Sequence, residues 1–297
     1  MSRYAAGITL YNPEIDRLQK NIAAIIPQVE KVYIVDNASQ NISAFISQYE
    51  NDERVKIIKN DENLGIARAL NQMCSAALED GFDWILTLDQ DSICEDDIIE
   101  KYSCYTDRED VAIITPRFSD DNEPQSISSS GFAPFEFVER CNTSASLIRL
   151  SVYKEVGGFD DIMFIDFVDF DFCASVIENG YFILRDNASV LHHQLGSAKE
   201  ITFFIPIGRL LGIKKLQKPL FTYNHSPLRT YYYVRNIRYF SYKHRQYFSP
   251  RYNMKVCFRW LSLKFLFEKE RCKKISASIK GFIDGGKLIK SLKQNNI

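Results

Sequence analysis

Short apolar runs alternate with segments of helical periodicity through the first part of the chain. The runs consist of β-branched, aromatic and leucine residues and are too short for buried helices. Because strands that alternate with helices usually form a parallel sheet covered by helices, the pattern predicts an α/β fold with a mostly parallel, twisted sheet. The predicted strands are Val32–Val35, Val55–Ile58, Trp84–Leu88 and Val111–Thr115.

Two helices have recognisable ends in the sequence. The first is predicted to begin at Asn12 and Pro13, with Asn12 as the cap, and to end near Pro27. Proline suits the first helical position because it has no amide hydrogen to leave unpaired. The second helix is predicted over Leu64–Asp80, with Gly81 as its C-terminal stop.

Polar residues follow the predicted strands at the points where ligands collect in parallel sheets. These segments are Thr9 to Asn12, Asp36 to Ser39 and Asp89 to Ser92. The carboxyl ends of neighbouring strands meet at one edge of a sheet, so residues there are the first candidates for chemistry. A polar, turn-rich segment, Ser119 to Ser130, is expected to form an exposed loop that closes over a substrate.

Charge is distributed very unevenly along the chain. Residues 1–200 carry 16 Lys+Arg and 35 Asp+Glu, whereas residues 201–297 carry 21 and 3. The shift predicts a domain boundary near residue 200, followed by a basic, aromatic-rich region that is helical from Leu228 onward. The basic region is expected to face phosphates, an anionic membrane surface, nucleic acid or the acidic domain of the same chain.

Several classes of protein are disfavoured by the composition. No apolar stretch reaches the length of a membrane-spanning helix, and the N-terminus lacks the features of a signal peptide, which predicts a cytoplasmic protein. The seven cysteines form no CxxC pair and are expected to be reduced, structural thiols. The sequence contains neither a GxxxxGK[ST] phosphate loop nor a GxGxxG fingerprint after a strand.

The motif Asp89-Gln90-Asp91 follows a predicted buried strand. Residues two apart in an extended backbone point to the same side, so the two carboxylates converge. Such a pair can hold Mg²⁺ or Mn²⁺, which takes oxygen ligands and is readily shared with substrate phosphates. The alternative for the isolated motif is an acidic turn that is simply solvated.

A second acidic cluster lies among large apolar residues. It consists of Asp166, Asp169 and Asp171. Charges in apolar surroundings are costly unless they are paired, bound to metal or functional, which makes one of these a candidate general base. The alternative, acids that stabilise the start of a helix continuing through Cys173 to Glu178, explains one carboxylate more readily than three.

Six motifs in order resemble the family 2 inverting glycosyltransferases, and most closely the bacterial rhamnosyltransferases of cell-surface polysaccharide assembly. The resemblance covers roughly residues 4 to 240 and implies a GT-A fold for residues 1–200, with residues 201–297 as a basic, mainly helical region for acceptor or membrane contact. The motifs are Ile8-Thr-Leu-Tyr-Asn-Pro13, Ile34-Val-Asp-Asn-Ala-Ser39, Asn63-Leu-Gly-Ile-Ala-Arg-Ala-Leu-Asn71, Leu88-Asp-Gln-Asp-Ser92, Gly157-Gly-Phe-Asp160 and Phe164-Ile-Asp-Phe-Val-Asp-Phe-Asp-Phe-Cys173.

The resemblance also implies roles for matching positions. Asp36 corresponds to the acid that reads the nucleotide base, and Asp89 and Asp91 correspond to the metal-binding pair. Asp169 falls where the family places its catalytic base, although Val168 stands where many relatives have glutamate, and Asp171 is the alternative base. The remaining positions implied to contact the nucleotide or donor are Thr9, Tyr11, Asn63, Arg68 and Gln90.

Further candidates come from the later part of the chain. His193 resembles the histidine that many relatives place near the metal or diphosphate, with neighbouring His192 as the alternative. The segment His225 to Asn236 resembles the rhamnosyltransferase-like subgroup, and there Arg229 and Arg235 are implied to contact donor or acceptor phosphates.

Taken together, the sequence predicts an enzyme that moves a sugar from a nucleotide diphosphate to an acceptor hydroxyl. The resemblance implies dTDP-L-rhamnose as donor, with UDP-hexoses as the alternative, Mg²⁺ or Mn²⁺ as cofactor, and a glycan or lipid-linked acceptor at the inner face of the cell membrane. Nucleic acid is not expected as a partner, and an oligomer remains open. The rival hypotheses are a haloacid-dehalogenase-like phosphatase, which shares a DxDx[TV] motif, and a non-catalytic nucleotide-binding scaffold.

Overall fold

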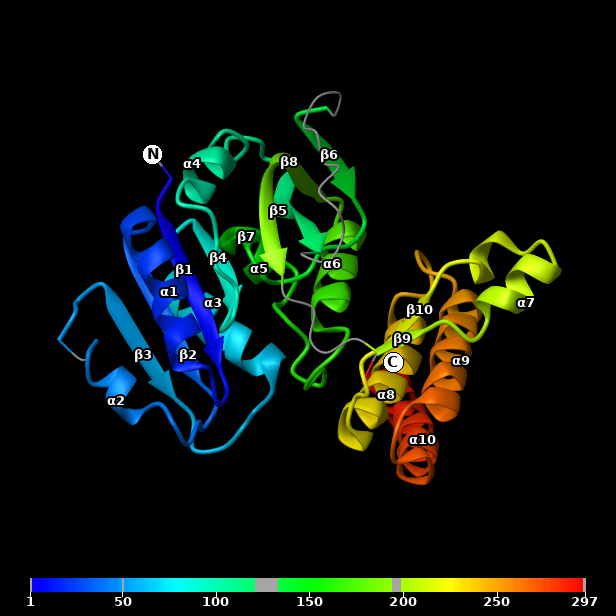
Figure 1. Ribbon diagram of the computed structural model, residues 1–297. Coiled ribbons are helices and arrows are strands. Elements are labelled where there is room, and N and C mark those ends of the chain that lie inside the picture. The colour runs from blue at the N-terminus through cyan, green and yellow to red at the C-terminus, as the bar shows by residue number, and fades with distance from the viewer. Residues whose placement is uncertain (1, 50, 121–132, 194–198, 296–297) are drawn as a thin grey trace. The chain divides into compact units, whose positions relative to one another are not determined.

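The computed structural model describes residues 2–49, 51–120, 133–193 and 199–295, which form two compact units, Met1–His193 and Gln194–Ile297 (Figure 1). The first unit contains β1 (Tyr4–Leu10), α1 (Ile15–Ile25), η1 (Ile26–Gln28), β2 (Lys31–Asp36), α2 (Ser43–Ile46), β3 (Val55–Lys59), α3 (Ile66–Glu79), β4 (Trp84–Asp89), α4 (Ile98–Ser103), β5 (Val111–Asp120), β6 (Phe135–Val138), β7 (Ser146–Arg149), α5 (Leu150–Glu155), α6 (Val168–Glu178) and β8 (Phe182–His193). The second contains β9 (Lys199–Ile201), α7 (Ile205–Leu210), η2 (Lys214–Leu216), β10 (Leu220–Thr222), α8 (Pro227–Lys243), α9 (Pro250–Phe267) and α10 (Arg271–Asn295).

The first unit is built on one eight-stranded sheet with the order β3-β2-β1-β4-β7-β5-β8-β6. Strand β1 pairs in parallel with β2 and β4, and β5 pairs in parallel with β8. The antiparallel strands are β7, which joins β4 to β5, and β6 at the edge beside β8. The α/β class with a mostly parallel sheet is confirmed, and every strand predicted from the sequence is present.

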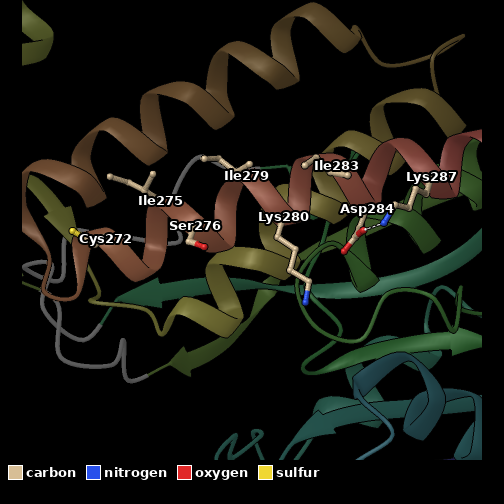
Figure 2. Close-up of a pocket in the computed structure, with 8 residues that line it drawn as sticks. All are labelled: Cys272, Ile275, Ser276, Ile279, Lys280, Ile283, Asp284 and Lys287. Carbon is tan, nitrogen blue, oxygen red and sulfur yellow. Dashed lines mark hydrogen bonds and ion pairs between the residues drawn. The ribbon is translucent and has the colours of Figure 1, made fainter.

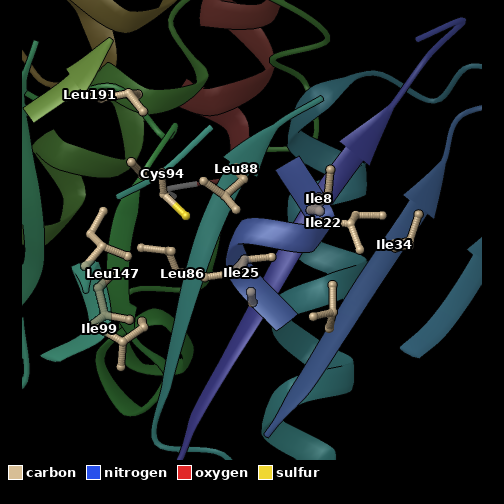
Figure 3. Packing of buried hydrophobic residues seen from close by; sticks show 14 of the residues in the cluster. Ile8, Ile22, Ile25, Ile34, Leu86, Leu88, Cys94, Ile99, Leu147 and Leu191 are labelled. Carbon is tan, nitrogen blue, oxygen red and sulfur yellow. The ribbon is translucent and has the colours of Figure 1, made fainter. Parts of the chain in front are cut away.

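The alternation of side chains along the central strands divides the core into two layers. On one face, Ile8, Ile34 and Leu86 pack with α1 and α4 in a buried cluster (Figure 3). On the other face α3 lies against β1, and it comes so close that a Cβ on Gly7 would lie 2.3 Å from the Met73 sulfur. Because both faces are covered, the strands read as nearly continuous apolar runs.

The predicted start of the first helix is wrong. Helix α1 begins at Ile15, and Asn12 adopts a left-handed backbone with φ 48° instead of capping it. The Asn12 side chain accepts a hydrogen bond from the Gln40 amide, and its own amide donates to Ser39 Oγ. Asn12 therefore joins the loop after β1 to the loop after β2, a tertiary role that competes with capping.

Other helix ends follow the sequence more closely. Helix α3 begins at Ile66, two residues later than predicted, and stops at the left-handed Gly81, as expected. Helix α6 runs to Glu178, and helix α8 begins at Pro227, where the side chain of Ser226 caps it by accepting from the Arg229 amide. The predicted loop from Ser119 is corrected at its start, because β5 continues to Asp120; residues 121–132 lie outside the described residues.

Close packing of α10 against α8 organises the second unit. A Cβ on Gly281 would lie 2.4 Å from the Tyr231 carbonyl oxygen, and one on Gly285 would lie 2.8 Å from the Arg235 carbonyl oxygen. Glycines four residues apart thus let the two helix backbones approach. No helix in the described ranges is long and apolar enough to cross a membrane.

This crossing gives a matched pair of stability variants. Gly281→Ala is expected to lower the free energy of unfolding by about 1–3 kcal/mol, because the added methyl meets fixed backbone. In Gly286→Ala the nearest atom is the Arg238 guanidinium at 3.0 Å, a flexible group, so a change within about 1 kcal/mol is expected. Urea unfolding of both variants checks this difference, and equal losses would contradict it.

A buried ionic cluster joins α9, α10 and the segment after β10. Glu268 accepts hydrogen bonds from Lys264 at 3.0 Å and from Lys274 at 2.8 Å, and all three side chains are buried. Thr222 and the Asn224 amide also donate to Glu268. Burial alone would raise the pKa of Glu268, but the hydrogen bonds from Lys274, Thr222 and Lys264 hold it below its usual value. One carboxylate thus neutralises only one of two buried ammonium groups.

Candidate active site

Three central strands bring their carboxyl ends to one edge of the sheet. In the register of the sheet, Leu10 lies beside Asp36 and Thr9 lies beside Asp89. Asp36 is buried, and its carboxylate accepts a hydrogen bond from the Ser39 amide at 3.0 Å. The segments that the sequence singled out after these strands are therefore neighbours in space.

Hydrogen bonds between the loops fix this edge further. The Tyr11 amide donates to Gln90 Oε1 at 2.8 Å, which joins the end of β1 to the end of β4. The Tyr11 ring remains half exposed at the edge. Gln90, implied to be a donor-binding residue, thus has a structural role in shaping the floor of the site.

The Asp89–Asp91 turn is held through its main chain. Asn21 of α1 donates to the Asp89 carbonyl oxygen at 2.8 Å, and Arg17 of the same helix donates to the Asp91 carbonyl oxygen. The Ser92 amide also donates to the Asp89 carbonyl oxygen, which closes the turn. Because these bonds use backbone atoms, they position the turn without occupying the carboxylate oxygens.

The donor chemistry of this turn fits a divalent cation that is shared with a ligand. Asp89 and Asp91 are both only partly buried and offer the hard oxygen atoms that Mg²⁺ and Mn²⁺ prefer. Among residues 2–49, 51–120, 133–193 and 199–295, no group of three or more His, Cys, Asp or Glu side chains is arranged to hold a metal. Two carboxylates leave the other coordination positions of such a cation to further ligands, and Mg²⁺ in particular is commonly shared with substrate phosphates.

The start of α6 lies against the start of α3. The Ile66 amide donates to the Phe164 carbonyl oxygen at 2.8 Å, and Gly65, with φ +87°, leaves no room for a Cβ beside Phe164. The Asn63 side chain accepts from the Gly65 amide at 2.9 Å and forms the turn that makes this approach possible. Asn63, implied to be a donor-binding residue, is thus placed in a structural turn.

Helix α3 also contacts the segment that leads into α6. Asn71 donates to the Phe159 carbonyl oxygen at 2.8 Å and accepts from the Phe159 amide at 2.9 Å. One turn earlier, Arg68 lies 3.4 Å from a carboxylate oxygen of Asp161, and both side chains are exposed. The implied donor contact of Arg68 would have to compete with this weak surface pair.

The backbone is strained just before α6. Asp166 and Phe167 have φ values of 63° and 69°, a conformation that L-residues with bulky side chains rarely adopt. Such strain persists only where surrounding contacts over-determine it, and it gathers at functional sites. Here it orients the first turn of α6, which carries Asp169 and Asp171.

The pKa of the Asp169 carboxyl group is raised. Burial raises its pKa to about 7; the hydrogen bond from the Phe170 amide opposes the shift, and the negative charges of Asp89 and Asp166 add to it. Asp169 also lines a cavity of about 10 Å³, room for at most one water molecule, together with Asn142 and Thr143. A carboxyl group poised near neutral pH beside the Asp89 turn suits proton transfer.

Asp171 lies in a different environment two residues later. Its side chain is buried, and its amide donates to the Phe167 carbonyl oxygen at 2.9 Å in the first turn of α6. Its burial and its place in the first turn agree with a structural role for Asp171 at the start of the helix.

The remaining predicted site residues belong to the end of β8 and to the second unit. His193 ends β8 and its backbone pairs with Asp120, but its side chain and that of His192 lie outside the part of the chain that the structure describes. Arg229 and Arg235 belong to α8 of the second unit, where Arg235 Nε donates to Asn236 and its guanidinium lies 4.7 Å from the Tyr232 ring centre.

Comparison with known proteins identifies the family. The family model described as glycosyl transferase family 2 matches residues 6–159, more than half of the chain. The chain belongs to glycosyl transferase family 2. This family 2 chain is also 30% identical over 251 residues to the dTDP-rhamnosyl transferase RfbF of Shigella flexneri, covering 79% of this chain and 78% of that protein.

Solved structures support the fold of this family 2 enzyme. S. aureus TarS 1-349 matches with a TM-score of 0.57 and 14% identity over 95% of this chain and 80% of that one. The mannosyltransferase PcManGT from Pyrobaculum calidifontis, solved with GDP-Man and Mn²⁺, matches with a TM-score of 0.57 and 12% identity over 99% and 86%. The GT-A fold and the assignment as a glycosyltransferase are confirmed, and the phosphatase hypothesis is wrong.

Sequence reasoning missed the residues that hold the acidic turn in place. Asn21 is fully buried on the apolar face of α1, beside Leu18 and Ile22, and Arg17 lies one turn before it. A polar residue within an apolar helical stripe is a usable signal, because burial of an unpaired amide is costly. Ser144, which accepts from the Asp89 amide at 3.3 Å, carried no such signal.

Proposed function

We propose that this enzyme transfers L-rhamnose from dTDP-L-rhamnose to a hydroxyl of a glycan or lipid-linked acceptor, with inversion at the anomeric carbon. The observation that carries the proposal is Asp169, a carboxyl group whose pKa is raised to about 7 by burial and by neighbouring charges that include Asp89. The donor follows from the relative RfbF, which is named a dTDP-rhamnosyl transferase. The enzymes of this fold bind nucleotide sugars, as the complex of TarS with UDP-GlcNAc illustrates.

The nucleotide is proposed to lie along the carboxyl ends of β1, β2 and β4. Asp36 would accept a hydrogen bond from the base, and Thr9 and Tyr11 would line its pocket, with Tyr11 offering a half-exposed ring for stacking. The diphosphate would then extend toward Asp89 and Asp91. This direction follows from the order of the strands, since β1 lies between β2 and β4.

A divalent metal is proposed at Asp89 and Asp91, with Mg²⁺ and Mn²⁺ as the candidates. Two proteins of similar fold, GalNAc-T7 and PcManGT, were solved with Mn²⁺ and a nucleotide or nucleotide sugar. When bound, such a metal supplies positive charge that offsets the charge of the departing diphosphate. His193 remains a proposed additional ligand.

The chemical step is proposed to use Asp169 as general base. Its carboxylate takes the proton of the acceptor hydroxyl while that oxygen forms a bond to the anomeric carbon. The bond from the anomeric carbon to the diphosphate oxygen breaks in the same displacement, and dTDP leaves with the electron pair. Attack from the face opposite the diphosphate inverts the anomeric centre.

Titration calorimetry tests the donor site. Binding of dTDP should require Mn²⁺, should be tighter than binding of UDP, and should weaken at least tenfold in Asp91→Ala, roughly the least expected on loss of a direct metal ligand. The matched control is Asp96→Ala, an exposed carboxylate from the same loop, which should bind as the unaltered enzyme does. Preference for UDP would favour the UDP-hexose alternative, and no binding of either nucleotide would reject the donor site.

The second unit is proposed to keep the enzyme at an anionic membrane, at the inner face of the cell membrane, where a lipid-linked acceptor resides. Residues 201–297 carry 21 Lys+Arg against 3 Asp+Glu. Each lysine or arginine close to the surface of an anionic bilayer contributes on the order of 1 kcal/mol to the free energy of binding. Arg229 and Arg235 are proposed to meet donor or acceptor phosphates.

A further inference from the structure

Exposed apolar side chains concentrate at one place in the second unit. Ile207, Leu210, Leu211 and Ile213, here called the α7 tip, are 39%, 86%, 62% and 43% exposed. Four large apolar residues within seven positions exceed the scattered exposure that is normal on a protein surface. Figure 1 shows α7 at the periphery of the second unit.

The segment that carries the α7 tip is folded and held by internal contacts. Gly208 lies so close to the following turn that a Cβ on it would be 2.7 Å from the backbone of Leu216. The Ile213 amide donates to the Gly208 carbonyl oxygen at 2.9 Å, and Gln217 Nε2 donates to the same oxygen at 3.3 Å. The chain thus folds back on itself while Leu210 and Leu211 remain outside this packing.

Aromatic contacts attach the hairpin formed by α7 and η2, which carries the α7 tip, to α9. The rings of Phe203 and Phe204 lie with their centres 6.2 and 5.7 Å from that of Phe267, the last residue of α9. The hairpin therefore has a fixed base, and it presents its apolar tip at a defined position on the second unit. Because the tip is already ordered, little conformational entropy is lost when it binds a partner.

Exposed basic side chains lie within and next to the α7 tip in the sequence. Arg209, Lys214 and Lys218 are all exposed, and no acidic residue occurs between Glu200 and Glu268 in the sequence. Apolar residues beside lysine and arginine form the pattern of segments that lie in the interface of an anionic bilayer. A second copy of the chain fits less well, because two such basic tips would repel each other.

We propose that the α7 tip inserts into the interfacial region of an anionic phospholipid bilayer, with Arg209, Lys214 and Lys218 contacting the headgroups. The inference deepens the proposed membrane contact and rests on that proposed function. It assigns the contact to one hairpin rather than to the basic charge of the whole unit. Insertion would orient the second unit, since the hairpin is fixed to α9.

A second exposed apolar surface, on helix α10, is the alternative membrane contact, and the experiment must distinguish it from the α7 tip. Ile275, Ile279 and Ile283 line a shallow pocket along one side of this helix, together with Lys280 and Lys287 (Figure 2). These isoleucines are less exposed than Leu210, and Asp284 lies among them, paired with Lys287 at 2.7 Å. A carboxylate in this position disfavours contact with an anionic surface.

Sedimentation of the full chain with vesicles tests the proposal. We expect binding to vesicles of phosphatidylcholine with phosphatidylglycerol but not of phosphatidylcholine alone, and a loss of at least about tenfold in affinity for the variant with Leu210→Ser and Leu211→Ser, from the apolar area removed. The control with Ile279→Ser and Ile283→Ser should bind as the unaltered chain does. An unchanged α7 variant, or a loss confined to the α10 variant, would overturn the proposal.

Two further measurements separate misfolding and donor failure from loss of membrane binding. Leu211→Trp should show a blue-shifted emission with the anionic vesicles and quenching by brominated lipid, and an unshifted emission on bound protein would overturn insertion. The variant with both serine substitutions should still bind dTDP with the affinity of the unaltered chain. Vesicle binding that persists in a protein unable to bind dTDP would reject the proposed donor site and leave the α7 assignment standing.

Discussion

Replacing Asp169 by asparagine is expected to lower the rate of sugar transfer by about 10²- to 10⁴-fold, the usual contribution of a general base. Asparagine keeps nearly the same shape but cannot accept the proton of the acceptor hydroxyl. Binding of dTDP should change little, because Asp169 is not proposed to hold the nucleotide. Initial rates of donor consumption with acceptor, alongside calorimetric affinities, measure the two effects separately.

The matched control is Asp171→Asn. Asp171 is buried at the base of α6, so this change should reduce stability while the folded enzyme keeps most of its activity. If Asp169→Asn retained near-normal transfer and Asp171→Asn abolished it, the assignment of the base would be wrong. Thermal unfolding of both variants shows whether a loss of activity reflects a loss of folded protein.

The ionisation of Asp169 also sets an expected pH dependence. Burial and the charges of Asp89 and Asp166 raise its pKa to about 7. The base must be deprotonated to act, so the rate of transfer should rise with pH, and the midpoint of this rise should lie at or below pH 7. A metal bound at Asp89 would remove part of the charge repulsion and lower the pH at which the rate rises. The folded pKa lies above that of an unfolded aspartate, so this group's contribution to stability is complete at low pH and is lost as the pH rises through 7.

The second large effect is expected in the stability of the second unit. Glu268→Gln removes the carboxylate that Lys264 and Lys274 share, and it leaves two buried ammonium groups without the counter-charge that this cluster supplies. Breaking a buried pair in this way typically costs about 3–5 kcal/mol. Urea unfolding followed by tryptophan fluorescence is a suitable measure, because Lys264 lies 3.9 Å from the Trp260 ring centre.

Glu270→Gln provides the matched control for the buried cluster. Glu270 pairs with Lys273 at 2.6 Å, but both side chains are exposed, so the loss of stability should be much smaller than for Glu268→Gln. Similar losses for Glu268→Gln and Glu270→Gln would contradict the stabilising role of the buried carboxylate. The folded pKa of Glu268 is lowered, so its contribution to stability is present above the unfolded value and is lost as the pH falls through the folded one.

The local sequence pattern was sufficient to predict four of the eight strands of the first unit, β2, β3, β4 and β5. Trp84–Leu88 and Val32–Val35 are nearly continuous apolar runs because helices cover both faces of the sheet. The same runs end in polar residues at the edge where ligands bind, which made Asp36, Asp89 and Asp91 visible in the sequence. The Asp89 turn and the raised pKa of Asp169 agree with separate duties for the two acidic motifs.

Positions whose role depends on distant partners were predicted less well. Asn12 has the residue type of a helix cap, yet its side chain bonds to Gln40 in another loop. Gln40 lies 28 residues from Asn12, at no helical or strand spacing, so no periodicity in the sequence could reveal this partner.

The sequence by itself determined the positions of four strands of the sheet, the uneven distribution of charge along the chain, and the acidic motifs that are candidates for the chemistry. These features are local, because they depend on residue type and on periods of two or 3.6 residues. Only the tertiary structure decided that the pKa of Asp169 is raised and that apolar residues such as Leu210 stay exposed. Leu210 has the same residue type as the buried Leu18, so the sequence could not distinguish them. Both properties depend on burial and neighbouring groups, which are set by the whole fold.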